Sequence, residues 1–179
     1  MHISLDVFKQ NNIKYDWRTL YVGFKLNKLK KSDISNYAVE FLVAHPDVNN
    51  KDIVELAWGD DYIDYESLLI DILQESTGQE NILDAKTWKC EDRKWRFCIL
   101  AYLKVKYHND YGMLLDRIAE VYADFQYPED VDSFINYLEP KDDINPANYS
   151  KEVNINRLIN IFNEFLKQEQ QELQNSNSV

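Results

Sequence analysis

Residues 89–109 have the apolar spacing of a buried helix. The apolar positions that recur three and four residues apart, on one helical face, are Trp95, Cys98, Ile99, Tyr102 and Leu103. The other faces carry Phe97, Leu100, Ala101 and Val105. Because apolar side chains surround the segment, we expect a central helix that other helices cover. A strand is the alternative, since residues 103–107 (LKVKY) alternate, but the apolar stretch is long for an ordinary strand.

The same periodicity predicts helices on both sides of this segment. The expected N-caps, Ser or Asp residues directly before apolar stripes, are Ser4, Asp16, Ser32, Asp64 and Ser150. Two further helices are expected to begin at Asn50 or Lys51 and at Asn109 or Asp110. The expected ends are marked by His45-Pro46, Gly59, Gly78 and Pro140. A helix is expected to begin at Pro128, which fits a first helical position. Together these signals predict an all-α fold of about nine helices in hairpin pairs around the central helix, as an irregular bundle or a short α-solenoid.

The length of the chain and the composition of its last residues predict the domain organisation. A chain of 179 residues is long enough for one good core, and residues 1–168 are expected to form a single helical domain. The last apolar stripe, from Ser150 to Lys167, should dock on the core. Residues 169–179 are rich in Gln, Glu, Asn and Ser, which predicts a disordered and dispensable polar tail. Inside an expected helix, Gly23 indicates that another backbone comes close.

Composition narrows the class of protein. Four Gly and four Pro are too few for a β-sandwich, which needs frequent turn signals. Cys90 and Cys98 fall on one predicted helix, about 12 Å apart along its axis, which is too far for a disulfide. The N-terminal segment lacks a signal-peptide pattern, and no apolar run is long enough to span a membrane. These features predict a cytoplasmic protein with reduced cysteines and no membrane partner.

The net charge of −11 is distributed in blocks. Residues 32–84 hold thirteen acidic residues against Lys51 alone, and residues 110–143 are also strongly acidic. Such a surface repels nucleic acid and attracts a basic protein. The basic cluster after the second expected helix, at positions 25, 28, 30 and 31, lacks the interleaved exposed aromatic residues of a nucleic-acid site. The alternative is that the acidic residues serve only solubility.

Two segments have an unusual sequence: residues 17–26 (WRTLYVGFKL) with Tyr37-Ala38, and residues 121–129 (VYADFQYPE) with Phe134-Ile135-Asn136-Tyr137. They resemble a bacterial family catalogued as domain of unknown function 2247, and they bracket residues 15–140. The family has a shorter Tyr-Met-Pro ending where this chain has residues 137–140 (YLEP). The resemblance implies no reaction, because the family has no established activity. In class, small acidic helical proteins are similar to immunity proteins that neutralise bacterial toxins.

The inventory of catalytic groups is thin. No phosphate loop, nucleophile elbow or paired-His metal spacing is present in the sequence, so we expect no cofactor and no metal. Asp116, Glu120 and Asp124 recur every four residues on one helical face and form the one possible polar site. A carboxylate-based metal-dependent enzyme, with His108 nearby, is therefore an alternative function. The simpler interpretation of these carboxylates is a solvated helix face.

One segment combines acidic residues with tyrosines. It contains the candidate partner-binding residues Asp60, Asp61, Tyr62, Asp64, Tyr65 and Glu66. Tyrosine is enriched in protein interfaces, and exposed carboxylates accelerate encounter with a basic partner. The segment favours a non-catalytic protein-binding module, with a toxin-neutralising immunity protein as its most concrete form. A structural loop and helix cap, or a helical scaffold protein, are the alternatives.

Overall fold

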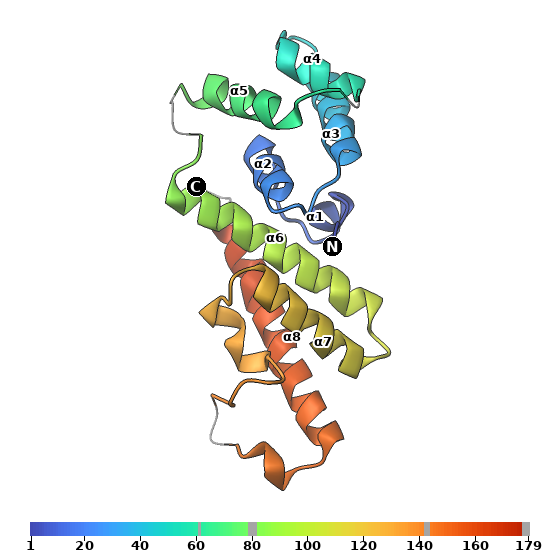
Figure 1. The fold of residues 1–179 in the computed structure, drawn as a ribbon, viewed down its shortest axis with the longest axis vertical. Helices are drawn as coiled ribbons and strands as arrows, with labels where there is room; N and C mark the ends of the chain where they lie inside the picture. The colour runs from blue at the N-terminus through green and yellow to red at the C-terminus, as the bar shows by residue number, and fades with distance from the viewer. Residues whose placement is uncertain (61, 79–81, 142–143, 177–179) are drawn as a thin grey trace. The chain divides into compact units, whose positions relative to one another are not determined.

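All regular secondary structure in the part of the chain that the structure describes is helical. The computed structural model describes residues 1–60, 62–78, 82–141 and 144–176, and it contains no strand in these ranges (Figure 1). The α-helices are α1 (Asp6–Gln10), α2 (Trp17–Lys25), α3 (Lys31–Ala44), α4 (Lys51–Trp58), α5 (Tyr65–Thr77), α6 (Ala85–Lys106), α7 (Tyr111–Asp124) and α8 (Lys151–Ser176). Two 3₁₀ helices, η1 (Glu129–Phe134) and η2 (Pro146–Asn148), lie between α7 and α8. The all-α prediction is confirmed.

The chain forms two compact units, Met1–Trp95 and Arg96–Val179, whose boundary lies within α6. We refer to them as unit 1 and unit 2. Unit 1 contains α1 to α5 and the first half of α6, and unit 2 contains the second half of α6, α7, η1, η2 and α8. That residues 1–168 act as a single domain stays a prediction.

Local sequence signals fix most helix ends in unit 1. The Asp16 carboxylate accepts hydrogen bonds from the backbone N–H groups of Arg18 and Thr19, and Asn50 caps α4 in the same way. Gly59, with φ of 72°, ends α4 in the left-handed conformation that glycine adopts without strain. The cap of α3 differs from the prediction: the helix begins at Lys31, and Asp33 rather than Ser32 accepts a hydrogen bond from the N–H of Lys30. An acidic side chain in the first turn replaces the expected hydroxyl.

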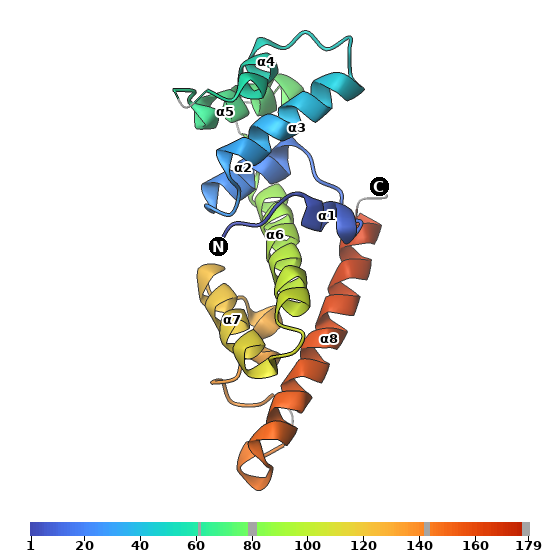
Figure 2. The same cartoon turned by 90° about the vertical axis from the view of Figure 1, so that its right-hand side faces the viewer.

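Trp95 is the centre of the core of unit 1. Its indole is fully buried, packs edge-on against Phe8 with 4.8 Å between ring centroids, and donates a 2.7 Å hydrogen bond to the carbonyl of Thr19. Gly23 lies directly beneath this ring. The close neighbour that the sequence predicted at Gly23 therefore exists, but it is an aromatic side chain and not a backbone. Around this core, α3 packs on α4, and α5 packs on α2 and α4 (Figures 1 and 2).

A buried polar network joins α2 to α6 inside unit 1. The hydroxyl of Thr19 donates to the carboxylate of Glu91 at 2.6 Å, and the ammonium of Lys94 pairs with the other oxygen of Glu91 at 2.8 Å. All three side chains are buried. Since a buried charge is costly unless it is paired, these contacts fix the register of α2 on α6.

The segment that the sequence placed at the centre of the fold is helical, so the strand alternative is wrong. Residues 97–101 and Leu103 are buried, as predicted. Val105 is the exception, because its side chain is 75% exposed. The buried part of α6 therefore ends at Leu103, about one turn before the helix itself ends.

In unit 2, the expected helix from Pro128 to Pro140 is shorter and tighter than predicted. It is the 3₁₀ helix η1, and Pro128 precedes it in an extended conformation with ψ of 124°. Phe134 is buried against Phe162 and Phe165 of α8, with ring centroids 5.4 Å and 5.1 Å apart. The spacing of residues 131, 134 and 135 suits one turn of either helix type, so the sequence could not separate them.

The last helix continues beyond its predicted end. Ser150 caps α8 through a hydrogen bond from the N–H of Val153, as expected, but α8 extends to Ser176 (Figure 2). Residues 169–176 are therefore helical where a polar tail was expected. Leu173 is 1% exposed and continues the buried stripe of Phe162 and Leu166. Glu169, at 4% exposure, is buried in the same extension.

Two further predictions concern the cysteines and the membrane. Cys90 and Cys98 do not form a disulfide, and Cys98 is buried. None of the helices in the described ranges has both the length and the apolar character needed to cross a membrane.

Candidate functional site

The loop between α4 and α5 is the first element of the candidate site, and its conformation is fixed at both ends. After Gly59, the carboxylate of Asp60 accepts a 3.0 Å hydrogen bond from the N–H of Tyr62. Asp64 then caps α5 by accepting from both the N–H and the hydroxyl of Ser67, at 3.2 Å and 2.9 Å. These two hydrogen bonds hold the pKa of Asp64 below its usual value. The described residues on either side of position 61 thus have a backbone held by hydrogen bonds.

Two large aromatic side chains project from this region into solvent. Trp58, the last residue of α4, is 83% exposed, and Tyr62 is 97% exposed. Val54, one turn before Trp58 on α4, is 38% exposed, while Ile53 and Leu56 on the same helix are buried. We call the set Val54, Trp58, Asp60 and Tyr62 the Trp58 surface. An exposed aromatic group flanked by polar residues is typical of a protein interaction site.

The six residues predicted for partner binding divide into four groups. Asp60 and Tyr62 are exposed and belong to the Trp58 surface, while Asp61 lies outside the described residues. Asp64 is exposed, but its carboxylate caps α5. The last two, Tyr65 and Glu66, have contacts with other side chains.

Tyr65 and Glu66 are occupied by contacts within unit 1. Tyr65 is 3% exposed, its hydroxyl lies 3.0 Å from that of Ser35, and the ammonium of Lys31 lies 5.2 Å from its ring centroid. Glu66 pairs with Lys25 at 2.6 Å. The ring of Tyr65 is therefore part of the core and cannot contact a partner without unfolding. No pattern in the sequence indicated this, because a tyrosine after an N-cap suits either role.

Trp58 was absent from the predicted site. It follows the buried positions 53 and 56 at helical spacing, so the pattern alone favours a partly buried end of α4. One signal pointed to it: Gly59 ends the helix directly after it, which leaves no later residue of α4 to cover the indole.

The second candidate site, on α7, does not converge in the structure. Asp116, Glu120 and Asp124 lie on one exposed face of the helix, as predicted. Asp116 accepts a hydrogen bond from Asn136 at 3.1 Å, and Glu120 accepts two from Arg117, at 2.7 Å and 2.8 Å. Within the described ranges, no group of three or more His, Cys, Asp or Glu side chains is placed to hold a metal ion. His108 is exposed and contacts the backbone carbonyl of Val105.

Comparison with known families gives a match over nearly the whole chain. Residues 5–170 match the model of a family described as uncharacterized protein conserved in bacteria (DUF2247). The chain belongs to this family. The match covers both units and confirms the resemblance that the two unusual segments indicated. No curated protein and no solved structure matches the chain. The family description names no reaction, so the functional argument rests on the geometry of the site.

Proposed function

We propose that this member of the bacterial family is a non-catalytic protein-binding module of the cytoplasm whose Trp58 surface binds a basic protein. The observation that carries the proposal is the exposure of Trp58 (83%) and Tyr62 (97%), which lie four residues apart in the chain. Burial of a large apolar side chain stabilises a protein by about 1.5–3 kcal/mol. Trp58 and Tyr62 do not gain this stabilisation while they are exposed. Trp and Tyr are also the residues most enriched among interface positions that dominate binding energy.

The charge of the surrounding sequence supports a basic partner. Asp60 lies between the two aromatic residues, and Lys51 is the one basic residue among positions 32–84. Carboxylates around an aromatic anchor accelerate encounter with a positive surface, and this effect weakens as salt screens the charges. A toxin-neutralising immunity protein is the most concrete role of this kind. The α7 carboxylates give the metal-dependent enzyme no comparable support, because Asp116 and Glu120 each bind a neighbouring side chain.

Affinity capture from a native bacterial lysate tests the proposal. The wild-type chain is compared with the double variant Trp58→Ala/Tyr62→Ala and with a control, Tyr137→Ala/Tyr149→Ala, which removes two exposed tyrosines from unit 2. The wild type and the control should retain a basic protein that elutes with salt, and the Trp58 double variant should not. Recovery of the same proteins by all three, or of an acidic partner, would show that the Trp58 surface is not the binding site.

A further inference from the structure

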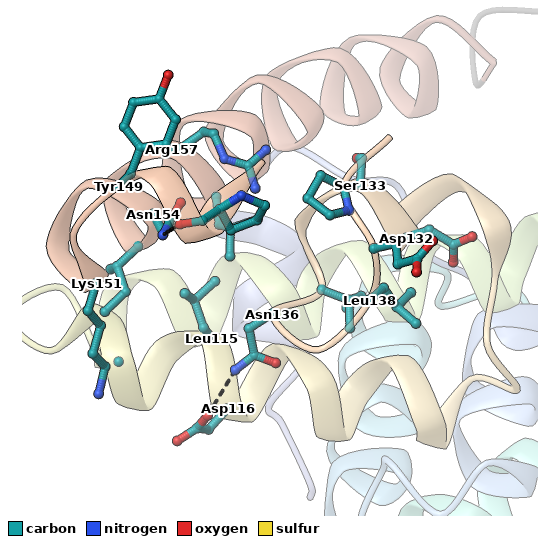
Figure 3. A pocket seen from close by; sticks show the side chains of 17 residues that line it. Leu115, Asp116, Asp132, Ser133, Asn136, Leu138, Tyr149, Lys151, Asn154 and Arg157 are labelled. Atoms are coloured by element: carbon teal, nitrogen blue, oxygen red, sulfur yellow. Dashed lines mark hydrogen bonds between the residues drawn. The ribbon is translucent and has the colours of Figure 1, made fainter. Parts of the chain in front are cut away.

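Unit 2 contains a cavity of about 580 Å³ that the proposed function does not use (Figure 3). Its walls come from α7, from the segment that follows η1, and from η2 and the first turns of α8. Small-molecule sites commonly have volumes of about 300–1,000 Å³. The cavity therefore has the size of a ligand site, and its lining shows which ligand chemistry it suits.

The middle of the cavity is aliphatic. Leu115 of α7, Ile135 and Leu158 of α8 line it and are each largely removed from solvent. In Figure 3, Leu115 lies between the polar groups labelled at the two sides of the cavity. An apolar side chain of a ligand would bury its surface against this wall.

One end of the cavity is basic and belongs to α8. Lys151 and Arg157, from the first two turns of the helix, line it, and the N-terminal end of a helix adds a partial positive charge. Asn154 lies between them. Its amide nitrogen donates to the carbonyl of Pro146 at 2.9 Å, and its Oδ1 is buried without a hydrogen bond in the described part of the chain. This end therefore suits a carboxylate together with an N–H donor.

The other end is acidic and is built on Asp132. One oxygen of this carboxylate pairs with Lys141 at 3.1 Å, and the carboxylate also interacts with the hydroxyl of Tyr122. Its Oδ1 is buried and has no hydrogen-bond partner among the described residues. Figure 3 shows Asp132 on the side of the cavity away from Asn154, Lys151 and Tyr149. A buried carboxylate oxygen with a free acceptor position suits an ammonium group.

We propose that this cavity binds a zwitterionic ligand of dipeptide size with apolar side chains. The ligand's ammonium group binds Asp132, its peptide N–H donates to Oδ1 of Asn154, and its carboxylate binds Lys151 and Arg157. The apolar side chains pack against Leu115. Each polar group of such a ligand has a complementary group in the lining, which also contains the carboxylates of Asp116 and Glu139. The inference concerns unit 2 and is independent of the Trp58 surface.

Titration calorimetry of the full chain with L-leucyl-L-leucine tests this inference. Two analogues serve as matched ligand controls: the N-acetylated dipeptide, which lacks the ammonium group, and the dipeptide amide, which lacks the carboxylate. We expect the zwitterion to bind and each analogue to bind at least about tenfold more weakly, since hydrogen bonds to charged groups are worth that much or more. Failure of the zwitterion to bind, or equal binding of all three ligands, would overturn the inference.

A charge reversal on α8 tests the orientation of the ligand. Lys151→Glu places an acidic group at the basic end, whereas Lys167→Glu makes the same change at an exposed position of α8 outside the cavity. Lys151→Glu should weaken binding of L-leucyl-L-leucine by about tenfold or more and should affect the dipeptide amide less. Lys167→Glu should leave both affinities unchanged. If Lys151→Glu and Lys167→Glu have the same affinity for L-leucyl-L-leucine, the basic end of the cavity does not bind the carboxylate.

Discussion

The indole ring of Trp95 occupies the space that a side chain at Gly23 would need. A Cβ atom added to Gly23 would lie 2.1 Å from Cζ2 of Trp95, which is far closer than any real contact. Glycine inside a helix costs about 1 kcal/mol relative to alanine, so α2 accepts a weaker helix position for this contact. Close packing of α2 on the first half of α6 depends on this pair.

Gly23→Ala is therefore expected to destabilise the protein although alanine favours a helix. Overpacking a core costs about 1–3 kcal/mol, and we expect a net loss near the upper end because the ring is fully buried and cannot move aside easily. Urea denaturation measures the change. Gly112→Ala in α7 is the control, since its nearest neighbour would be 3.6 Å away, and it should be neutral or slightly stabilising. Equal effects of the two substitutions would contradict the role of Gly23.

The buried network of Thr19, Glu91 and Lys94 gives a second prediction. Thr19→Val keeps the shape of the side chain but removes the hydroxyl, which donates to the carboxylate of Glu91 at 2.6 Å and accepts from the N–H of Asp16 at 3.1 Å. Hydrogen bonds to charged groups contribute about 1.5–3 kcal/mol, so the free energy of unfolding should fall by that amount. Thr19→Ser keeps the hydroxyl and should cost less. If the valine and serine variants are equally stable, the hydroxyl does not support the charge of Glu91.

The pair of Tyr122 and Asp132 predicts how stability changes with pH. The hydrogen bond from Tyr122, together with Lys141, lowers the pKa of Asp132 below its ordinary value of 3.8, and the same hydrogen bond followed by burial raises the pKa of Tyr122 to about 12. A lowered carboxyl pKa contributes stability above pH 3.8 that is lost as the pH falls through the folded-state pKa. A raised tyrosine pKa contributes stability below pH 10 that is lost as the pH rises towards about 12.

Thermal unfolding of the wild type and of Asp132→Asn between pH 2 and pH 6 measures the acidic limb. The wild type should be more stable than the variant at pH 6, and the difference should shrink as the pH falls below about 4. Tyr122→Phe should reduce the same difference, because it removes the main hydrogen bond. A difference that stays constant over this range would show that Asp132 does not titrate in this way.

Leu173 tests the unexpected extension of α8. The residue is 1% exposed, and Leu→Ala at a buried position costs about 2–5 kcal/mol. We expect Leu173→Ala, and truncation after Gln168, to lower the free energy of unfolding by similar amounts. Gln171→Ala, at an exposed position of the same turn, is the control and should be neutral. If truncation after Gln168 leaves stability unchanged, residues 169–176 are the dispensable tail that their composition suggests.

The sequence predicted the helices better than it predicted the site. Caps such as Asp16, Asn50 and Asp64 act over three residues, so a local signal was enough to place α2, α4 and α5. The exposure of a side chain depends instead on distant residues. Tyr65 is buried because Ser35 and Lys31 lie over it, and no spacing within its own segment reveals this. Trp58 is exposed because none of the residues that the structure describes covers its indole.

The cavity of unit 2 was equally beyond prediction. Its lining combines α7, η1 and α8, which are separated along the chain by up to about forty residues. Asp116 was selected for its helical spacing with Glu120, yet of the two only Asp116 lines the cavity. Asp132 and Asn154, the two lining residues with a buried oxygen that lacks a hydrogen bond among the described residues, have ordinary sequence surroundings. Convergence of such groups becomes visible only in the folded chain.

The affinity of the captured partner for Trp58→Ala, relative to the wild type, tests the central claim most directly. Truncation of an interface residue that dominates binding costs about 2 kcal/mol or more, which corresponds to a loss of about thirtyfold in affinity. We predict a loss of that size for Trp58→Ala, with an unchanged melting temperature because the indole is exposed. Tyr137→Ala, the matched change in unit 2, should bind like the wild type. An affinity of Trp58→Ala within about twofold of the wild type, a difference of about 0.4 kcal/mol, would contradict the account.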